Sequence, residues 1–429
     1  MQTVYIVDGV RTPWLKVRST PGPFSASDLA VYAARTLLLR QTFAAHDLDE
    51  IVTGCVMPQP NEANISRIIA LRLGCGPYVP AYTVQRNCAS GLQAIDNARL
   101  DIMSGRCDLV LAGGTEAMSH APVLFSTQFI HCLAAWRLAN NWQSRLKALC
   151  QFSPKQLRPI WGLLQGLIDP IVGLSMGQTA EVLAHRFGIT RLQADEFALL
   201  SHQRLARAYD HSIFSNEIIP LIDYDQHCYQ YDDGLRRDTN LSKLQKLSPV
   251  FDKPFGSVTA GNSAQITDGA AFLLLANKKA IQQYQLPVLA RLVQVAWAGV
   301  KPEEMGLGPV HAVAYLMKQQ KLNFSDIDFW EINEAFSAQL LACLSAWQDK
   351  NYCQTHFDHD AFGAIDLQRL NINGGAIAMG HPVGATGARI VLHLIHNLKR
   401  QCAQRGIATL CIGGGQGGAV LVEQCSEVV

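Results

Sequence analysis

The chain has 429 residues, of which 48% are hydrophobic and 17% charged, and its formal net charge is +1. This composition is typical of a globular protein with a large core, and the length predicts two or three folding units. A net charge near zero argues against nucleic acid as a partner. Twelve cysteines without a C-x-x-C pair or a zinc-like cluster predict reduced thiols and no bound metal.

Residues 4–7 form an apolar strand pattern, and we expect no signal or transit peptide before it. The last four residues do not match a peroxisomal address. No uncharged apolar run reaches the ~18 residues that span a bilayer. These features predict a cytoplasmic enzyme of bacterial type.

Short apolar runs typical of buried strands alternate with helical periodicity. Apolar residues at a helical spacing over 92–102 predict a helix after Cys88, and those over 390–398 predict another after His381. This alternation predicts an α/β fold in which helices cover mainly parallel sheets. The expected strands are residues 51–57, 108–113, 270–276, 288–298, 328–332, 408–412 and 419–423.

A weak internal repeat relates the two ends of the chain. The triplet Asn61-Glu62-Ala63 opens a helical pattern upstream of Cys88, and Asn333-Glu334-Ala335 opens another upstream of His381. Cys88 and His381 are each followed by a helix, a strand and consecutive glycines. If the halves are duplicates, pseudo-twofold packing places the two helix starts side by side.

Residues 121–250 fit neither repeat. We predict an N-terminal half from residues 1–120 and 251–280, a C-terminal half from residues 281–429, and an inserted loop or cap domain over residues 121–250. The insertion combines amphipathic periodicity with an apolar stretch broken by glycine and proline, which favours a cap that carries substrate contacts. For residues 125–170 the alternative is a helical hairpin packed on its own domain.

Cys88 stands where a strand over residues 82–85 gives way to a helix, beside Asn87, Ser90 and Gly91. A free thiol has a pKa of about 8.5, and unsatisfied N–H groups at a helix start stabilise its anion. We therefore predict that Cys88 is a nucleophile. The cysteines expected to be small buried hydrophobic side chains are Cys55, Cys75, Cys107, Cys343 and Cys402.

His381 lies in a glycine-rich segment, which indicates backbone that approaches a ligand or another backbone closely. We predict that His381 is the catalytic base. His356 and His359 lie in a charged stretch that is typical of solvated histidines. The glycines around His381 are Gly374, Gly375, Gly380, Gly384 and Gly387.

Cys411 ends an expected strand, and the glycine run after it contains G-x-G-x-x-G. That pattern raises the rival hypothesis of a dinucleotide-binding oxidoreductase. In that fold a helix follows the glycines, whereas residues 419–423 predict a strand, and eleven residues after Gly418 are too few for a βαβ unit. We predict a tight strand–turn–strand that offers backbone N–H donors, with Cys411 as a proton carrier.

Asn333 follows the expected strand over residues 328–332. Its amide suits a role in holding a water or an oxyanion. The alternative is a helix N-cap, and the two roles are compatible.

Taken in this order, the motifs resemble the thiolase family over nearly the whole chain. Residues 87–91, 333–336, 380–387 and 411–418 stand where the family has its active-site blocks. Residues 4–13, 112–118, 176–181 and 257–271 match the framework between them. The resemblance implies a five-layer αβαβα fold of two similar halves plus a loop domain, assembled as a homodimer or tetramer.

The resemblance implies an acetyl-CoA C-acyltransferase, or 3-ketoacyl-CoA thiolase, of fatty acid β-oxidation, with coenzyme A as co-substrate and no permanent cofactor. In a ping-pong reaction Cys88 attacks the 3-oxo carbon after His381 helps to generate its thiolate. Cys411 then protonates the departing acetyl-CoA carbanion. The N–H groups of Cys88 and Gly413 form one oxyanion hole, and His381 with a water held by Asn333 forms the other.

The family also implies contacts with acyl-CoA and CoA. Arg236 occupies a CoA-contacting position and would meet a phosphate, whereas the alternative for Arg236 is a solvated loop charge. Ser175 and Ala264 replace the histidine and serine usual in short-chain biosynthetic thiolases. The implied CoA contacts are Arg236, Ser175, Met176, Ala260 and Ala264.

Residues 174–177 and the long insertion favour long-chain 3-ketoacyl-CoA thiolases, including the β subunit of the trifunctional complex, although that branch tends to have histidine in place of Asn333. The insertion predicts a hydratase/dehydrogenase α subunit as partner, or peripheral membrane contact through residues 121–170. The alternatives are an acetyl-CoA acetyltransferase that forms acetoacetyl-CoA, a ketosynthase and a non-catalytic lipid-binding relative.

Overall fold

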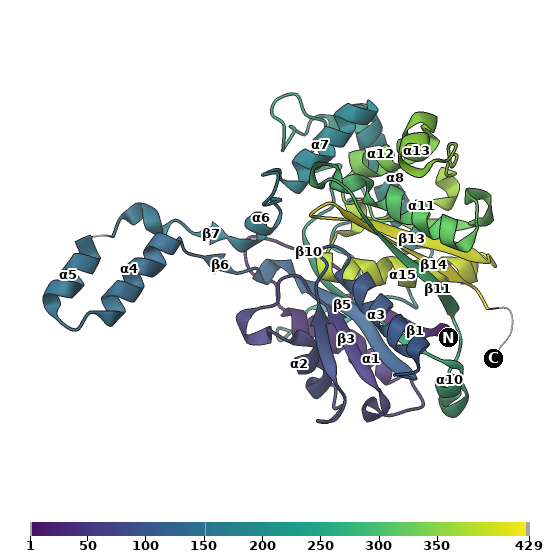
Figure 1. Ribbon diagram of the computed structural model, residues 1–429, viewed down its shortest axis with the longest axis horizontal. Coiled ribbons are helices and arrows are strands. Elements are labelled where there is room, and N and C mark those ends of the chain that lie inside the picture. Colours follow the sequence, from purple (N-terminus) through teal and green to yellow (C-terminus); the bar gives the residue numbers. More distant parts are fainter. Residues whose placement is uncertain (1, 151, 426–429) are drawn as a thin grey trace.

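The structure is a computed structural model that describes residues 2–150 and 152–425 (Figure 1). Its main strands are β1 (Val4–Arg11), β2 (Leu15–Lys16), β3 (Glu50–Gly54), β4 (Ala81–Val84), β5 (Leu109–Ala117), β10 (Thr267–Ala276), β11 (Ala290–Gly299), β12 (Phe329–Ile332), β13 (Arg405–Ile412) and β14 (Gln416–Glu423). They form one ten-stranded sheet in the order β12-β13-β14-β11-β1-β10-β5-β3-β4, with β2 paired to β10.

The main helices of the body around this sheet are α1 (Ala26–Leu38), α2 (Ile65–Arg72), α3 (Ser90–Ser104), α7 (Met176–Phe187), α8 (Arg191–Asp210), α10 (Lys278–Tyr284), α11 (Gly308–Gln320), α12 (Ser337–Gln348), α13 (Lys350–Phe357), α14 (Ala376–Met379) and α15 (Val383–Arg400). No helix within residues 2–150 and 152–425 has the length and hydrophobicity to cross a membrane. Every strand expected from the sequence is present, and so are the helices expected after Cys88 and His381. The apolar spacing therefore identified the elements that surround these two residues.

The sheet is mixed, so the prediction of mainly parallel sheets was wrong. Only β3 with β4, β3 with β5, and β12 with β13 pair in parallel. The other pairs of this sheet are antiparallel. A strand buried on both faces has the same apolar pattern in either direction, so composition does not determine strand direction. The short turn between β13 and β14 imposes the antiparallel arrangement there.

The sheet has an N-terminal part that contains β1, β10, β5, β3 and β4, and a C-terminal part that contains β12, β13, β14 and β11. Three apolar layers alternate with these two parts. The first joins α1 and α2 to β1, β5 and β10, and the second contains α3 and α15. The third joins α11 and α12 to β12, β13 and β14. Along β10, Phe272 faces the first layer and Leu273 the second, as strand alternation requires. Figure 1 shows α3 and α15 between the two parts of the sheet, which gives the predicted five-layer αβαβα order.

The starts of α3 and α15 meet through glycine. A Cβ atom on Gly91 would lie 2.8 Å from the carbonyl oxygen of Gly384, and one on Gly387 would lie 2.5 Å from the backbone nitrogen of Leu92. These distances leave no room for a side chain at either contact. The prediction that the two helix starts lie side by side is confirmed.

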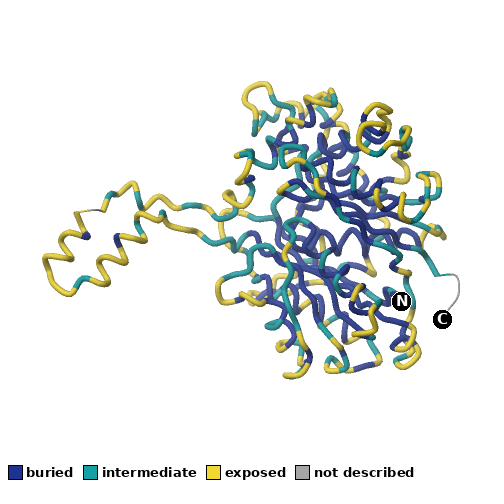
Figure 2. Tube along the Cα trace, in the orientation of Figure 1, coloured by how far each residue is buried: buried dark blue, intermediate teal, exposed yellow. Residues whose placement is uncertain are grey.

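The insertion is divided between an arm and the body. The arm comprises residues 123–161 and contains the strand pair β6 (Val123–Leu124) and β7 (Ile160–Trp161) with the helices α4 (Thr127–Leu138) and α5 (Trp142–Cys150). It projects away from the body (Figure 1), and most of it is exposed (Figure 2). The alternative of a hairpin packed on its own domain is therefore wrong.

The rest of the insertion packs onto both parts of the body, and its residues Ile219 and Leu221 belong to the first apolar layer. Leu183 of α7 and Phe197 of α8 belong to the third apolar layer, together with α11 and α12. The short helix α6 (Gly162–Gly166) connects the arm to α7. The division into two halves and a separate domain over residues 121–250 stays a prediction.

We predict that Gly114→Ala destabilises the protein. A Cβ atom on Gly114 would lie 2.0 Å from the carbonyl oxygen of Gly384, which is backbone and cannot rotate away. We expect the free energy of unfolding to fall by about 1–3 kcal/mol, measured by urea denaturation. The matched control is Gly299→Ala, because a Cβ atom there meets nothing within 4 Å. Equal stability of the two variants would mean that the backbone at Gly384 can move away at no cost.

Candidate functional site

Two cavities meet at Cys88. The inner cavity has a volume of about 180 Å³ and is bordered by Cys88, His381 and Cys411. The outer hollow, of about 530 Å³, lies beside it and reaches the base of the arm. The residues that border both are Cys88, Met118, Leu167, Met176 and Val383. Three side chains predicted from distant segments therefore converge on one cavity.

Cys88 lies on a tight turn between β4 and α3. Asn87 has a φ of 43°, and Ser90 stabilises this turn by donating to the carbonyl of Asn87 at 2.7 Å. The amide of Asn87 donates to the carbonyl oxygen of Gly413 at 2.8 Å. Because of these contacts the half-buried Cys88 faces the turn that follows β13.

The electrostatics of Cys88 differ from the expectation for a helix start. Hydrogen bonds from the backbone N–H groups of Gly413 and Cys88 itself lower the pKa of the Cys88 thiol, but burial outweighs them and raises it. The resting side chain is therefore a neutral thiol near neutral pH. The same two N–H groups point at the sulfur, where they can stabilise a negative oxygen formed beside it.

His381 is buried between α14 and α15, with 9% of its surface exposed. Its Nδ1 lies 2.7 Å from Oγ1 of Thr386, and that hydroxyl donates its own proton to the carbonyl of Pro382 at 3.0 Å. Nδ1 must therefore carry the proton, and Nε2 keeps its lone pair. Burial, together with the charge of Arg389, lowers the pKa of His381 to about 3, so the ring is neutral.

Asn333 follows β12 and is fully buried behind His381. Its Nδ2 lies 3.4 Å from Nε2 of His381, and its Oδ1 has no hydrogen-bond partner among the described residues. An unpaired buried amide oxygen is costly, and this one suits a water shared with the ring. The alternative of a helix N-cap is wrong, because α12 begins at Ser337 with Phe336 as its N-cap.

Cys411 lies near the end of β13 with 1% of its surface exposed. It packs with Met305 and Ala335. Burial and the neighbouring Cys88 sulfur raise the pKa of the Cys411 thiol well above its usual range. A thiol held in its neutral form beside a second sulfur can act as a proton donor.

The glycine run after Cys411 forms the turn between β13 and β14. Gly414 and Gly415 have φ values of 90° and 83°, which glycine adopts without strain. The strand predicted after the glycines is present, which removes the ground for the dinucleotide-binding hypothesis. Gly413 borders the outer hollow. Its backbone N–H donates to the Cys88 sulfur, and its carbonyl oxygen accepts a hydrogen bond from the Asn87 amide.

A buried carboxylate fixes the walls of the site, and sequence reasoning did not single it out. Glu116 accepts hydrogen bonds from the backbone N–H groups of Val56, Met57 and Gly384, at 2.9, 3.0 and 3.0 Å. It therefore connects the loop after β3 to the first turn of α15. Burial raises the pKa of Glu116 to about 7 despite these three donors. Its place at the end of an apolar strand was the only sequence feature that could have identified it.

The predicted CoA contacts divide into two groups. Ser175, Met176 and Ala264 border the inner cavity, and Ser175 also caps α7. Ala260 is exposed and is not among the residues that border either cavity. Arg236 is exposed too, and it borders a separate hollow of about 330 Å³ with His202, Arg207 and Arg237. Three arginines around one hollow are better suited to bind an anionic group than a single solvated arginine on a loop would be.

Several other residues near the cavities had no distinctive sequence pattern. Thr386 could have been found from its position five residues after His381, in the first turn of the helix that follows it. The apolar walls could not, because they come from separate loops, short 3-10 helices and the start of α15: Met118, Leu167, Phe251, Met305, Phe336 and Val383. Cys402 is exposed, contrary to prediction, whereas Cys55, Cys75, Cys107 and Cys343 are buried as expected.

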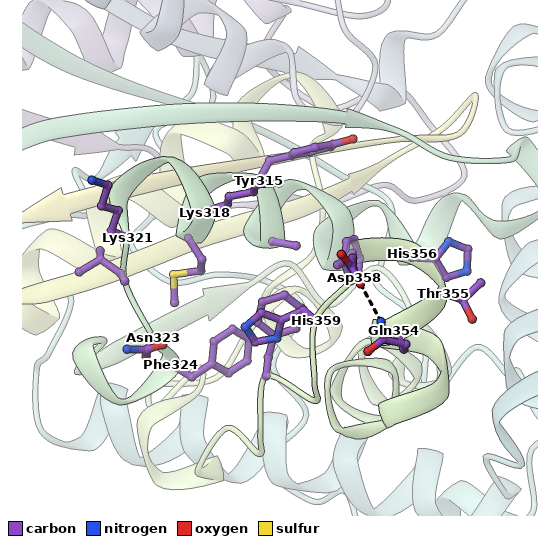
Figure 3. A pocket seen from close by; sticks show the side chains of 15 residues that line it. Tyr315, Lys318, Lys321, Asn323, Phe324, Gln354, Thr355, His356, Asp358 and His359 are labelled. Atoms are coloured by element: carbon purple, nitrogen blue, oxygen red, sulfur yellow. Dashed lines mark hydrogen bonds between the residues drawn. The ribbon is translucent and has the colours of Figure 1, made fainter.

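A larger hollow of about 700 Å³ lies on the C-terminal half, between α11 and α13 (Figure 3). His356 and His359 border it and are exposed, as expected for solvated histidines. Lys318 and Lys321 complete its exposed rim. It contains none of the side chains predicted to react, so it is not the candidate site.

Comparison with protein-family models gives two matches that together span almost the whole chain. The thiolase N-terminal domain matches residues 4–279, and the thiolase C-terminal domain matches residues 286–424. The chain belongs to the thiolase family. This membership decides against the ketosynthase alternative, and it agrees with the five-layer fold described above.

Thiolases of known sequence and structure match this chain over nearly its whole length. The human mitochondrial 3-ketoacyl-CoA thiolase is 34% identical over 427 residues, which are 99% of this chain and 98% of the relative. Its crystal structure in complex with CoA has a TM-score of 0.84 and covers 99% and 98% of the two chains.

Two bacterial thiolases match over the same extent. The 3-ketoacyl-CoA thiolase of Photorhabdus laumondii is 36% identical over 433 residues, with 99% and 100% covered. The acetyl-CoA acetyltransferase structure from Syntrophomonas wolfei is 32% identical, with a TM-score of 0.86 and coverage of 99% and 100%. Thiolases of two named activities therefore share this architecture.

We predict that Cys88 is alkylated slowly at neutral pH and faster as the pH rises. Only the thiolate reacts with iodoacetamide, and burial places the pKa of Cys88 above that of an ordinary thiol, about 8.5. Mass spectrometry of the Cys88 peptide measures the rate at each pH, with the exposed Cys228 as a reagent control. If the rate for Cys88 is already maximal at neutral pH, the resting side chain is a thiolate. That result would contradict a neutral Cys88 thiol beside a neutral His381 ring.

Proposed function

We propose that this chain is a 3-ketoacyl-CoA thiolase that cleaves 3-oxoacyl-CoA with CoA into acetyl-CoA and a shortened acyl-CoA, as in fatty acid β-oxidation. The observation that carries this proposal is the convergence of Cys88, His381 and Cys411 on one cavity. Relatives of that name match the chain over its full length. CoA is a substrate of this reaction rather than a resident cofactor.

In the first half-reaction Cys88 forms a bond to the 3-oxo carbon. Nε2 of His381 has the free lone pair in this tautomer, so it takes the proton of the Cys88 thiol. The C2–C3 bond then breaks and leaves an acyl group on Cys88. The C2 carbanion of the departing acetyl-CoA takes its proton from Cys411, which is neutral before this step because its pKa is raised.

In the second half-reaction the Cys411 thiolate removes the proton of an incoming CoA thiol. The CoA sulfur attacks the acyl carbon, and Cys88 leaves and regains its proton from His381. Each residue thus returns to its starting state without an external acid or base. The low pKa of His381 makes its protonated form short-lived unless a negative group shares the cavity.

Two sets of donors suit the two oxyanions of this reaction. The N–H groups of Cys88 and Gly413, which point at the Cys88 sulfur, suit the oxygen of the tetrahedral intermediate. Protonated His381, with a water on Asn333, suits the enolate oxygen of acetyl-CoA. Such donors each contribute about 100- to 1,000-fold in rate.

The two cavities suit the two ends of the substrate. Ser175, Met176 and Ala264 line the inner cavity, which we assign to the pantetheine arm. Arg236 and its neighbouring arginines suit a CoA phosphate. The outer hollow has apolar walls that include Leu163, and we assign it to the acyl chain.

A second candidate function is an acetyl-CoA acetyltransferase that forms acetoacetyl-CoA. The structural similarity to the Syntrophomonas wolfei enzyme favours it, since that protein has this name and a TM-score of 0.86. The outer hollow of about 530 Å³ favours the first candidate, because an acetyl group does not need such a volume. CoA-dependent cleavage of 3-oxoacyl-CoA substrates of increasing length tests the choice.

The proposed function includes an oligomeric assembly and a cytoplasmic location for the protein. We expect a homodimer or tetramer, and a hydratase/dehydrogenase subunit as the partner that supplies 3-oxoacyl-CoA. All twelve cysteines are free thiols, which suits a reducing cytoplasm.

We predict that Cys88→Ala and Cys411→Ala fail at different steps. Cys88→Ala lacks the nucleophile, so thiolysis should fall by at least about 10,000-fold and no acyl-enzyme should form. Cys411→Ala should still form the acyl-enzyme, but its kcat should fall about 100-fold or more, with loss of α-proton exchange from acetyl-CoA.

Mass spectrometry of the acylated protein and deuterium exchange into acetyl-CoA provide the two measurements. Cys343→Ala is the matched control, because Cys343 is buried near Cys411 but borders neither cavity. Acylation of the Cys88→Ala variant, or normal proton exchange by Cys411→Ala, would reassign these roles.

We predict that Leu163→Trp shortens the accepted acyl chain. A larger side chain would fill the outer hollow, so kcat/KM for long-chain substrates should fall about tenfold or more relative to acetoacetyl-CoA. Leu164→Trp is the matched control, since Leu164 is 57% exposed and does not border the hollow. Unchanged chain-length preference in Leu163→Trp would place the acyl chain elsewhere.

A further inference from the structure

Glu334 is a buried carboxylate next to Asn333 in the chain, and it takes no part in the proposed reaction. It is 1% exposed. Its Oε2 accepts a hydrogen bond from Oγ of Ser201 at 2.7 Å, and its Oε1 accepts one from Nδ2 of Asn371 at 2.8 Å. The backbone N–H of Ile377 donates to Oε2 at 3.3 Å. Glu334 therefore joins α8, the loop before α14 and α14 itself.

Asn371 binds the main chain on the other side of Asn333. Its Oδ1 accepts a hydrogen bond from the backbone N–H of Ile332 at 2.9 Å, and its Nδ2 also donates to the carbonyl of Ile332 at 2.8 Å. Asn371 has a φ of 44°, a left-handed conformation that asparagine adopts more readily than most residues. Asn333 therefore stands between two residues, Ile332 and Glu334, that are bonded to the same buried amide.

Ser201 completes this arrangement from α8, which Figure 1 shows beside α12. Its Oγ donates to Glu334 and accepts a hydrogen bond from the backbone N–H of Gly375 at 3.1 Å. A Cβ atom on Gly375 would lie 2.2 Å from Cδ of Glu334, so the carboxylate fits only because this residue is glycine. We call Ser201, Glu334 and Asn371 the Glu334 cluster.

His381 is held by contacts outside this cluster. Its backbone N–H donates to the carbonyl of Gln265 at 2.9 Å, and its Nδ1 is bonded to the hydroxyl of Thr386. For Asn333 the backbone N–H donates to the carbonyl of Thr409 at 2.9 Å, but the side-chain Oδ1 has no partner among the described residues. The Glu334 cluster therefore acts on the Asn333 amide, through the main chain on either side of it, rather than on the imidazole ring.

The position of the Asn333 amide matters because it must share a water with His381. Its Nδ2 lies 3.4 Å from Nε2 of the ring. A displacement of about 1 Å in a group that positions a reacting atom can cost about 100-fold in rate. A buried polar cluster in which the donors and acceptors are paired holds its side chains in one arrangement.

We propose that Glu334 is a positioning residue that, with Ser201 and Asn371, holds the Asn333 amide in place for the enolate step. The inference rests on the proposed function, in which a water on Asn333 stabilises the enolate oxygen of acetyl-CoA. Ser201 belongs to the insertion and borders neither cavity. A part of the insertion without substrate contacts thus contributes to proton transfer at acetyl-CoA.

The test compares two partial reactions in the same variants. Deuterium exchange into acetyl-CoA requires the enolate, whereas acylation of Cys88 by an acyl-CoA uses the N–H groups of Cys88 and Gly413. Ser201→Ala removes one donor to Glu334, and we expect exchange to fall about tenfold while acylation changes less than about twofold. Glu334→Gln keeps the length of the side chain but places a donor against a donor, so exchange should fall about 100-fold.

Ser66→Ala is the matched control. Ser66 is fully buried on α2, in the N-terminal part of the structure, and borders neither cavity. Its hydroxyl donates to the carbonyl of Ile51 at 3.0 Å and accepts from Thr53 at 3.1 Å. The variant therefore loses as many buried hydrogen bonds as Ser201→Ala, and its ratio of exchange to acylation should stay unchanged.

A double-mutant cycle separates positioning from general damage. In Asn333→Ala the amide is gone, so adding Ser201→Ala should lower exchange no further. A fully additive effect, an equal loss of exchange and acylation, or normal exchange in Ser201→Ala would overturn the positioning role and leave the proposed reaction standing. Ser201→Ala decides the test if Glu334→Gln does not fold. An unmodified protein that neither exchanges acetyl-CoA protons nor cleaves 3-oxoacyl-CoA would overturn the proposed function, and this role with it.

Discussion

The fold depends on the contact between the first turns of α3 and α15. At Gly91, Gly114 and Gly384 the backbones approach so closely that no side chain fits. Glu116 then fixes the first turn of α15 to the loop after β3. Since Cys88 precedes one helix and His381 precedes the other, this contact determines how near the two reactive side chains lie.

The chemistry of the site follows from burial rather than from charge. A neutral thiol and a neutral imidazole face one cavity, because burial raises the pKa of Cys88 and lowers that of His381. Thr386 determines which ring nitrogen has the lone pair. In the proposed reaction, charge appears in the cavity only when a substrate carbonyl is there to accept it, and this would protect the cysteine from unproductive reactions.

The sequence predicted the elements and the three side chains that meet at the inner cavity, but not the walls between them. Periodicity identified the helices after Cys88 and His381, and glycine patterns identified the β13–β14 turn. Strand direction was predicted wrongly, because apolar composition is the same in parallel and antiparallel strands. Glu116 and the apolar residues around the cavities act through contacts between distant segments, and a single sequence contains no local pattern for such contacts.

The turn at Gly413 has a consequence for how enzymes of this shape diversify. Its N–H faces the reactive sulfur and its carbonyl receives the Asn87 amide, so both functional groups belong to the main chain. Substitution of neighbouring side chains does not remove either group while the loop keeps its path. Natural variation can therefore reshape the substrate cavities and their selectivity, while the main-chain donor beside the Cys88 sulfur is kept.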